Sequence, residues 1–344
     1  MQAARRAIAR PLGACTVSRE RGVMAARIQD VWADNFEEEM AHVRAVLKRY
    51  PYVAIDTEFP GIVARPIGNF KGSSDYHYQT LRCNVDLLHL IQLGLSVCDG
   101  EGNVPPDVST WQFNFRFDVE EDMCAPDSLE LLSKAGLDFE RHRHLGIDHE
   151  HFGEMLITSG LALFDDVRWV SFHSGYDFGY LLKLVTCAPM PAQEHEFFDL
   201  LHLWFPRIYD IKYLMRSCKT LKGGLQDVAD DLRVSRIGQQ HQAGSDSLLT
   251  AFTFFRLRDR FFDGVIDDAK YLGCIYGFAN TASAALTPAG AVYYQVRGAT
   301  TPALQHATAN GSMAAAPVTP TSAPMQSPYS PSAAYARRPE AGAA

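Results

Sequence analysis

YVAIDTEFPG, residues 52–61, has the pattern of a buried strand that ends in two acids. Residues two apart on a strand point to the same face, so Asp56 and Glu58 project together, away from the apolar side chains. Neighbouring carboxylates repel each other, and a divalent cation removes that repulsion. Pro60 and Gly61 stop the strand directly after the acids. An isolated DxE pattern is weak evidence, but on a buried strand it predicts a metal-binding edge of a sheet.

Two later segments each place an acid in the first turn of an expected helix. They are FHSGYDFGY (172–180), with Asp177, and HQAGSDSLL (241–249), with His241 and Asp246. Taken singly, each acid is explained by the helix dipole, and His241 by an exposed loop. Together with the DxE pair, they supply four carboxylates for two divalent ions and a histidine for a water nucleophile. This combination predicts metal-dependent phosphodiester hydrolysis.

The hydrophobic pattern around these motifs predicts an α/β protein with a mixed sheet flanked by helices. We expect strands over residues 52–59, 86–98, 110–118 and 167–172. We expect helices over residues 35–50, 128–135, 149–159, 197–205, 210–218, 224–232 and 245–263, and another from about 176. The alternating aromatics of 111–117 favour a half-buried strand over an RNA-stacking platform.

The composition of the 344 residues limits the class of protein. A net charge of −8 and a pI near 5.8 argue against a general nucleic-acid binder, although bound divalent cations would offset that charge locally. Seven cysteines without a CxxC pair indicate a reduced intracellular protein rather than a disulfide framework. No apolar run approaches the length of a membrane span.

The two ends differ in composition from the rest of the chain. Residues 1–26 are rich in arginine and we expect them to be disordered. They resemble an organellar transit peptide, but we favour a leader ahead of a second start at Met24. Residues 281–344 are rich in Ala, Pro, Ser and Thr, and we expect a disordered tail, with a brief strand within Gly290–Gly298. Its Ser-Pro and Thr-Pro pairs suggest phosphorylation sites, although we favour a plain solvated tail.

Four histidines in RHRHLGIDHEH (141–151) raise the question of a zinc site. The segment has no cysteine nearby and no four-ligand spacing. We therefore interpret it as a solvated helix face and loop.

Several longer segments resemble one enzyme family. They are DTEFPGIVARPIG (56–68), LRCNVDLLHLIQLGL (81–95), SFHSGYDFGYLLK (171–183) and IGQQHQAGSDSLLT (237–250). These segments are similar to the CAF1/POP2 deadenylases, which belong to the DEDDh branch of the DEDD 3′-to-5′ exonucleases. The similarity runs from about Ile28 to Gly277, within a ribonuclease domain that we place at residues 27–280. The resemblance implies a ribonuclease H-like fold.

The resemblance also implies roles for the five site residues. Asp56 would bridge two divalent ions, Mg²⁺ or Mn²⁺. Glu58 and Asp246 would complete one metal site, and Asp177 the other. His241 would be the general base. All five positions match the family pattern.

The implied activity is poly(A)-specific 3′-to-5′ exoribonuclease action on single-stranded RNA, which releases 5′-AMP and shortens mRNA tails in mRNA turnover and gene silencing. The implied partners are the scaffold subunit of the CCR4–NOT complex and a leucine-rich-repeat CCR4-type deadenylase. From this role we expect a cytoplasmic and nuclear protein, with neither a membrane nor DNA as a partner.

Three residues are weaker candidates for contacts with RNA. Phe59 would pack on the terminal nucleotide, and Lys219 and Lys222 would line the phosphate path. The alternatives, a core aromatic and two solvated lysines, remain open. Two alternative functions also remain open. One is an interaction subunit that bridges a scaffold and another nuclease, and the other is a DNA-directed proofreading exonuclease.

Overall fold

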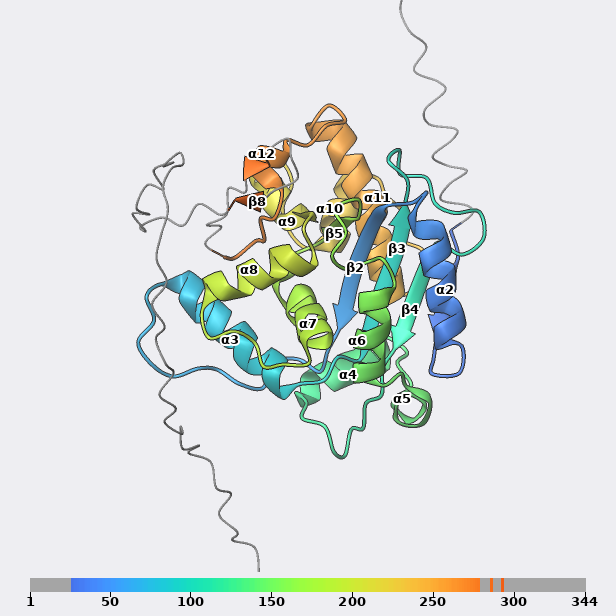
Figure 1. The fold of residues 1–344 in the computed structure, drawn as a ribbon, viewed down its shortest axis with the longest axis vertical. Coiled ribbons are helices and arrows are strands. Elements are labelled where there is room, and N and C mark those ends of the chain that lie inside the picture. Colours follow the sequence, from blue (N-terminus) through green and yellow to red (C-terminus); the bar gives the residue numbers. More distant parts are fainter. Residues whose placement is uncertain (1–25, 279–284, 287–291, 294–344) are drawn as a thin grey trace, which may run out of the picture. The chain divides into compact units, whose positions relative to one another are not determined.

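The computed structural model describes residues 26–278, 285–286 and 292–293. A six-stranded mixed sheet forms its framework, in the order β1-β4-β3-β2-β5-β6 (Figure 1). The strands are β1 (Ile28–Val31), β2 (Tyr52–Glu58), β3 (Gln92–Cys98), β4 (Thr110–Asn114), β5 (Arg168–Ser171) and β6 (Ile208–Asp210). Strands β2, β3 and β4 pair antiparallel, whereas β1 with β4, β2 with β5, and β5 with β6 are parallel. The predicted α/β class with a mixed sheet is confirmed.

Helices cover both faces of this sheet (Figure 1). One face packs on α2 (Phe36–Leu47), α3 (Ser73–Leu87), α6 (His149–Thr158), α7 (Gly175–Thr186) and α8 (Glu194–Trp204). The other face packs on α9 (Ile211–Leu214), α10 (Leu225–Asp231), α11 (Ala243–Phe261) and α12 (Asp268–Tyr271). Two further helices, α4 (Pro126–Lys134) and α5 (Phe139–Leu145), contribute to a smaller apolar cluster.

Strand β2 divides its side chains between the two faces. Val53 and Ile55 belong to the apolar cluster that includes α7, whereas Ala54 belongs to the cluster that includes α11. Because side chains alternate along a strand, Asp56 and Glu58 lie on the α11 side. The predicted division of this strand is therefore confirmed.

Helix α11 begins directly against β3. A Cβ atom on Gly94 would lie 1.8 Å from the carbonyl oxygen of Ala243, so only glycine permits this approach. Ala243 to Phe255 are all buried, because the helix packs across β2 and β3 and against α10. This close packing fixes the first turn of α11, which contains Asp246.

The predicted strand over 86–98 is wrong in its first part. Residues 73–87 form helix α3, which the sequence did not predict, and the strand begins only at Gln92. Helix α3 ends at Leu87, and Lys183 Nζ donates to the carbonyl oxygens of Val85, Asp86 and Leu88 near this end. The apolar-rich stretch over residues 85–97 spans both the end of α3 and strand β3, and it concealed this boundary.

The other predicted elements are present within a few residues of their expected bounds. The strand predicted over 110–118 is shorter, ending at Asn114, and all of its residues are buried, so the prediction of a half-buried strand is wrong. The four alternating aromatics of 111–117 are fully buried. The helix predicted over 210–218 is α9 followed by a 3₁₀ turn at Met215–Ser217. The sequence did not predict β1, β6, α5 or α12, which are too short to show a period.

Two of the four histidines in 141–151 contradict the predicted solvated segment. His142 is buried, with Nδ1 2.8 Å from the carbonyl oxygen of Phe115, and His149 stacks on the ring of Phe115. His144 and His151 have exposed side chains, as expected. The sole three-residue metal-ligating group found in the described residues lies elsewhere in the chain.

The predicted leader and most of the predicted tail lie outside the described residues. Within Gly290–Gly298, residues Val292–Tyr293 form strand β8, which pairs antiparallel with β7 (Ala285–Leu286). In the described part of the chain, no helix combines the length and apolarity needed to cross a membrane.

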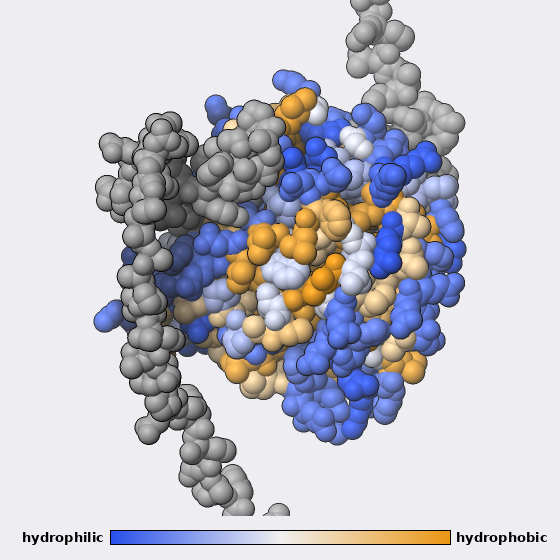
Figure 2. Space-filling view, viewed as in Figure 1, coloured by the Kyte–Doolittle hydropathy of each residue, from blue (hydrophilic) through white to orange (hydrophobic). Residues whose placement is uncertain are grey.

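Apolar side chains also reach the surface. Figure 2 shows apolar surface near the middle of the face drawn in Figure 1, bordered by hydrophilic surface. Leu163, Phe164 and Leu203 are among the exposed large apolar residues. The N–H of Leu163 donates to the carbonyl of Trp204, so these three residues lie near one another.

Candidate active site

Three of the four predicted acids come together between the end of β2 and the start of α11. Asp56 and Glu58 project from β2, and Asp246 lies in the first turn of α11. One carboxylate oxygen of each lies within 4.8 Å of the others. Asp56 and Glu58 are partly exposed, and Asp246 is buried. The fold thus brings three of the four acids named in the sequence into one cluster.

Asp177 reaches the same region from the opposite face of the sheet. It lies in the first turn of α7 and accepts a hydrogen bond of 2.8 Å from Thr57 Oγ1. Thr57 lies between Asp56 and Glu58, and its side chain points to the α7 side of β2. Asp177 is not part of the three-residue group, but its charge raises the pKa of both Asp56 and Glu58.

A buried carboxylate fixes the turn that leads to Asp177. Asp210 accepts hydrogen bonds from the backbone N–H groups of His173, Lys212 and Tyr276, at 2.8, 2.8 and 2.9 Å. Three separate segments therefore meet at one buried acid. The turn between β5 and α7 is held to β6 in this way.

His241 adopts an uncommon backbone conformation. Its φ of +61° lies in the left-handed region, which costs a residue other than glycine about 1–2 kcal/mol. Its backbone N–H donates to Asp246 Oδ2 at 2.9 Å, and the residue is partly exposed. The histidine and the acid that the sequence paired are thus joined directly through the backbone.

The carboxylates of this site repel one another. Burial raises the pKa of Asp56 well above its ordinary value, and the charges of Asp177, Asp246 and Glu58 raise it further. Burial, followed by the charges of Asp246 and Asp177, raises the pKa of Glu58 to about 8. Burial raises the pKa of Asp177 to about 7, against the hydrogen bond from Thr57. Without a bound cation, the site therefore disfavours full ionisation of these acids near neutral pH.

One cation partly compensates this charge. Arg236 Nη2 lies 2.9 Å from Asp246 Oδ1, and both side chains are nearly buried. Arg236 also donates to Gln226 Oε1 at 2.7 Å and to Ser245 Oγ at 3.0 Å. Its charge lowers the pKa of Asp56 and of Glu58. These three partners therefore fix the guanidinium group beside the acids.

The donor set of the site suits a hard divalent cation. Asp56, Glu58 and Asp246 offer only carboxylate oxygens, the ligands that Mg²⁺ and Mn²⁺ prefer. Their mutual repulsion is what a bound cation relieves. These residues fit a metal ion, and Asp177 lies close enough for its charge to raise the pKa of Asp56 and Glu58.

The three weaker candidates lie outside the acid cluster. Phe59 is partly buried and stacks on Tyr176, with ring centroids 4.9 Å apart. Lys219 and Lys222 are both exposed, in the segment between the 3₁₀ turn and α10. Phe59 directly follows the DxE pair, whereas no described contact joins either lysine to the acids.

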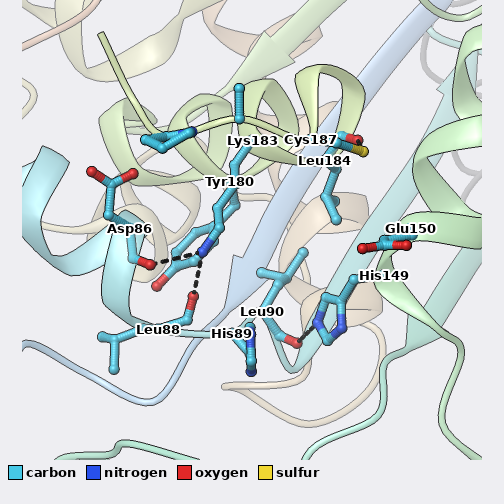
Figure 3. Close-up of a pocket in the computed structure, with 12 residues that line it drawn as sticks. Asp86, Leu88, His89, Leu90, His149, Glu150, Tyr180, Lys183, Leu184 and Cys187 are labelled. Carbon is cyan, nitrogen blue, oxygen red and sulfur yellow. Dashed lines mark hydrogen bonds between the residues drawn. The ribbon is translucent and has the colours of Figure 1, made fainter. Parts of the chain in front are cut away.

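A cavity of about 530 Å³ lies between α6, α7 and the segment that follows α3 (Figure 3). Tyr180, Lys183 and His149 line it, and none of the five described site residues does. The amine of Lys183 is held by three carbonyl groups, and His149 Nε2 lies 2.9 Å from the carbonyl oxygen of Leu90. An aromatic contact connects the cavity with the residue next to Glu58: the ring centroid of Tyr180 lies 5.3 Å from that of Phe59.

Sequence reasoning missed the residues that support the acids. Strand alternation predicts that Thr57 faces away from Asp56, but it does not predict the hydrogen bond from Thr57 to Asp177. Nothing in the sequence pattern pointed to Arg236 or Asp210, because their partners lie in other segments of the chain. Such contacts become visible only when the fold brings these segments together.

Comparison with known proteins gives consistent matches. The family model described as CAF1 family ribonuclease matches residues 31–151 and 160–254. The poly(A) ribonuclease pop2 of Schizosaccharomyces pombe is 55% identical over 256 residues, which is 74% of this chain and 76% of that protein.

Solved structures also match a large share of the chain. The Mg²⁺- and Mn²⁺-bound form of S. pombe Pop2p has a TM-score of 0.72 and 55% identity, covering 73% of this chain and 99% of that one. A CAF1 chain co-crystallised with the yeast NOT1 MIF4G domain has a TM-score of 0.61 and 36% identity, covering 73% and 96%. The expected ribonuclease H-like fold is confirmed, and the chain belongs to the CAF1 family of ribonucleases.

Proposed function

We propose that this chain is a poly(A)-specific 3′-to-5′ exoribonuclease that shortens mRNA tails and releases 5′-AMP. The observation that carries the proposal is the convergence of Asp56, Glu58 and Asp246 within 4.8 Å, with Asp177 beside them. A CAF1-family relative that is named as a poly(A) ribonuclease and is 55% identical supports the substrate.

Two divalent ions, Mg²⁺ or Mn²⁺, are the proposed cofactors. Asp56, Glu58 and Asp246 would hold one ion, and Asp56 with Asp177 the other. The chemistry that such ions supply is activation of a water molecule and stabilisation of charge on the leaving oxygen. The oxygen-only donor set and the Mg²⁺- and Mn²⁺-bound form of Pop2p support this choice.

The protein's own groups have separate roles in the proposed reaction. The imidazole of His241 takes the proton from the attacking water, a role for which a histidine is suited near neutral pH. Asp246 ties the backbone of His241 to the acid cluster through the 2.9 Å hydrogen bond. Thr57 orients Asp177, and Arg236 orients Asp246.

Single-stranded RNA would approach the acids with its 3′ end first. Phe59 is proposed to support the terminal nucleotide, because it follows Glu58 directly and its ring is fixed by Tyr176. The exposed Lys219 and Lys222 are proposed to attract the phosphates that follow. The adenine preference rests on the family relationship.

The proposed setting is the CCR4–NOT complex. The CAF1 chain co-crystallised with the NOT1 MIF4G domain supports a scaffold partner. The exposed apolar residues Leu163, Phe164 and Leu203 are the type of surface that protein partners cover. A leucine-rich-repeat CCR4-type deadenylase is a second proposed partner, by family resemblance. The role of an interaction subunit is therefore compatible with catalysis.

The proposed location is the cytoplasm and the nucleus. Full-length protein and a version that starts at Met24 would be expressed with a C-terminal fluorescent tag. The same cytoplasmic and nuclear distribution for both is expected. Organellar import of the full-length form alone would contradict the proposal.

A cleavage assay tests the proposed activity. Purified protein is incubated with 5′-labelled RNA that ends in a run of adenosines, in Mg²⁺, Mn²⁺ or EDTA. A ladder of single-nucleotide steps that stops at the first base other than adenine is expected with metal and not with EDTA. A DNA oligonucleotide of the same sequence tests the proofreading alternative. No cleavage of RNA or DNA by folded protein with either metal would overturn the activity of the isolated chain, and would leave the interaction role or an enzyme that works only with its partners.

A further inference from the structure

The strained backbone of His241 needs an external support. A residue other than glycine keeps a positive φ only where its surroundings impose it, and such residues gather at functional sites. The 2.9 Å hydrogen bond from the His241 N–H to Asp246 Oδ2 fixes the peptide group that precedes His241. The peptide group that follows His241 leads to Gln242.

The side chain of Gln242 joins this peptide to the sheet. Gln242 Oε1 accepts from Gln92 Nε2 at 3.3 Å and from Gln112 Nε2 at 3.0 Å. Gln242 Nε2 donates to the carbonyl oxygen of Ala135 at 2.7 Å. One side chain therefore links the His241 loop to β3, to β4 and to the end of α4.

The same two sheet glutamines hold the residues that follow. Gln92 Oε1 accepts from the N–H of Ala243 at 3.2 Å, and Gln112 Oε1 accepts from the N–H of Gly244 at 2.9 Å. We call Gln92, Gln112 and Gln242 the amide clamp. The clamp satisfies two N–H groups at the start of α11 that have no partner within the helix.

The amide clamp is itself fixed in the sheet. Gln92 and Gln112 are 2% and 7% exposed. Gln92 Nε2 also donates to Asn114 Oδ1 at 2.8 Å, and Gln112 Nε2 to Asp30 Oδ1 at 2.9 Å. A buried network in which every amide has partners is rigid and defines a single geometry. Such a network is well suited to hold a loop residue in a strained conformation.

We propose that Gln242 is a positioning residue for His241: through the amide clamp, it keeps the imidazole where the attacking water is deprotonated. This inference rests on the proposed exoribonuclease function. It assigns to Gln242 a role in the rate of the reaction and not in metal binding. Asp246 has its own support in Arg236, and α11 keeps its bonds to Gln92 and Gln112 when the Gln242 side chain is changed.

The test replaces Gln242 with Met, which keeps the length and shape of the side chain and removes the amide. The matched control is Gln239→Met. Gln239 lies on the other side of His241 and donates to the carbonyl oxygen of Lys134 at 3.2 Å, but it is exposed and does not bond to the sheet. Both variants are made in the full-length protein.

Four quantities are measured: kcat and KM on the adenosine-tailed RNA, Mn²⁺ affinity by calorimetry, and amide hydrogen exchange over residues 238–244 without metal. For Gln242→Met we expect kcat to fall by about tenfold or more, because general base catalysis depends on placement. KM and Mn²⁺ affinity should stay within about threefold of wild type, and exchange at His241 should become faster. The control should match wild type in all four.

A kcat for folded Gln242→Met equal to that of wild type would overturn the inference. A parallel loss of Mn²⁺ affinity would also overturn it, because the clamp would then support the acids. Gln242→Glu keeps the acceptor for both sheet amides, and should recover part of the lost rate and of the protection. If Gln242→Met does not fold, Gln242→Asn takes its place with the same criteria. Absence of cleavage by wild type and by the control would instead contradict the proposed function itself.

Discussion

The acid cluster at the end of β2 and the cavity beside Lys183 both contain ionisable groups that are buried or partly buried, but their charges are balanced differently. Asp56 and Glu58 face other acids, and Arg236 is the cation that lowers their pKa values. Lys183, in contrast, is held by three carbonyl groups. The acid cluster therefore needs a bound cation, whereas the hydrogen-bond partners of Lys183 all belong to the protein.

The largest expected effect is on catalysis at the acid cluster. Asp56→Ala should lower the cleavage rate by about a thousandfold or more, because Asp56 lies at the centre of the proposed metal sites. Without metal, the variant should be at least as stable as wild type, since its loss relieves repulsion. Initial rates on adenosine-tailed RNA and thermal unfolding in EDTA measure both. An active variant would remove the basis of the assignment.

Metal-free stability should fall as pH rises, because of the acid cluster. Glu58 has a folded pKa of about 8, above its ordinary 4.5, so between these values the native state holds a proton that the unfolded state has lost. Glu58→Gln should flatten this decline in urea unfolding with EDTA. An unchanged slope in the variant would show that Glu58 is not under the predicted repulsion.

His149, which lines the cavity, should make stability depend on pH in the opposite direction. Burial lowers the pKa of His149 from 6.5 to about 4, so in this range the unfolded state takes up the proton and stability falls as pH falls. The loss would be at most about 3 kcal/mol. His149→Gln should remove most of it, measured as the difference from wild type at each pH. Equal slopes for the variant and wild type would contradict the predicted burial effect.

Lys183→Met should affect stability and not catalysis. The amine donates three hydrogen bonds to carbonyl groups at the end of α3, and loss of such a charged donor costs about 2 kcal/mol. The free energy of unfolding should fall, while kcat of the folded protein should stay near wild type. Lys48→Met, at an exposed lysine, is the control. A large fall in kcat would link the cavity to the reaction.

The smallest expected effect concerns the hydrogen bond between Thr57 and Asp177. Thr57→Val keeps the shape of the side chain but removes the donor to Asp177 Oδ1. We expect a roughly tenfold lower rate, equivalent to about 1.4 kcal/mol, because Asp177 loses its orientation. Thr57→Ser, which keeps the hydroxyl, should stay close to wild type. Equal rates for the Val and Ser variants would show that the bond is dispensable.

Local sequence patterns predicted the parts of the fold and site that depend on neighbouring residues. Strand alternation placed Asp56 and Glu58 together, and helix-start patterns placed Asp177 and Asp246 correctly in first turns. The same reasoning missed helix α3, because a stretch rich in apolar residues spans both the end of that helix and β3.

Contacts between distant segments could not be predicted in this way. Gln92 and Gln242 are 150 residues apart, and their hydrogen bond exists only because α11 begins against β3. His142 looked like a solvated residue within a charged segment, yet it is buried against Phe115. In both cases tertiary packing decides the environment of a polar side chain, and local composition does not.

One titration tests most directly whether the acid cluster, and not the cavity, binds the catalytic cations. The melting temperature and the cleavage rate are measured in the same Mn²⁺ series for wild type, Asp56→Ala and Lys183→Met. Wild type and Lys183→Met should gain stability and activity over the same Mn²⁺ range, and Asp56→Ala should gain neither. Mn²⁺-dependent stabilisation and cleavage that persist in Asp56→Ala would contradict the account.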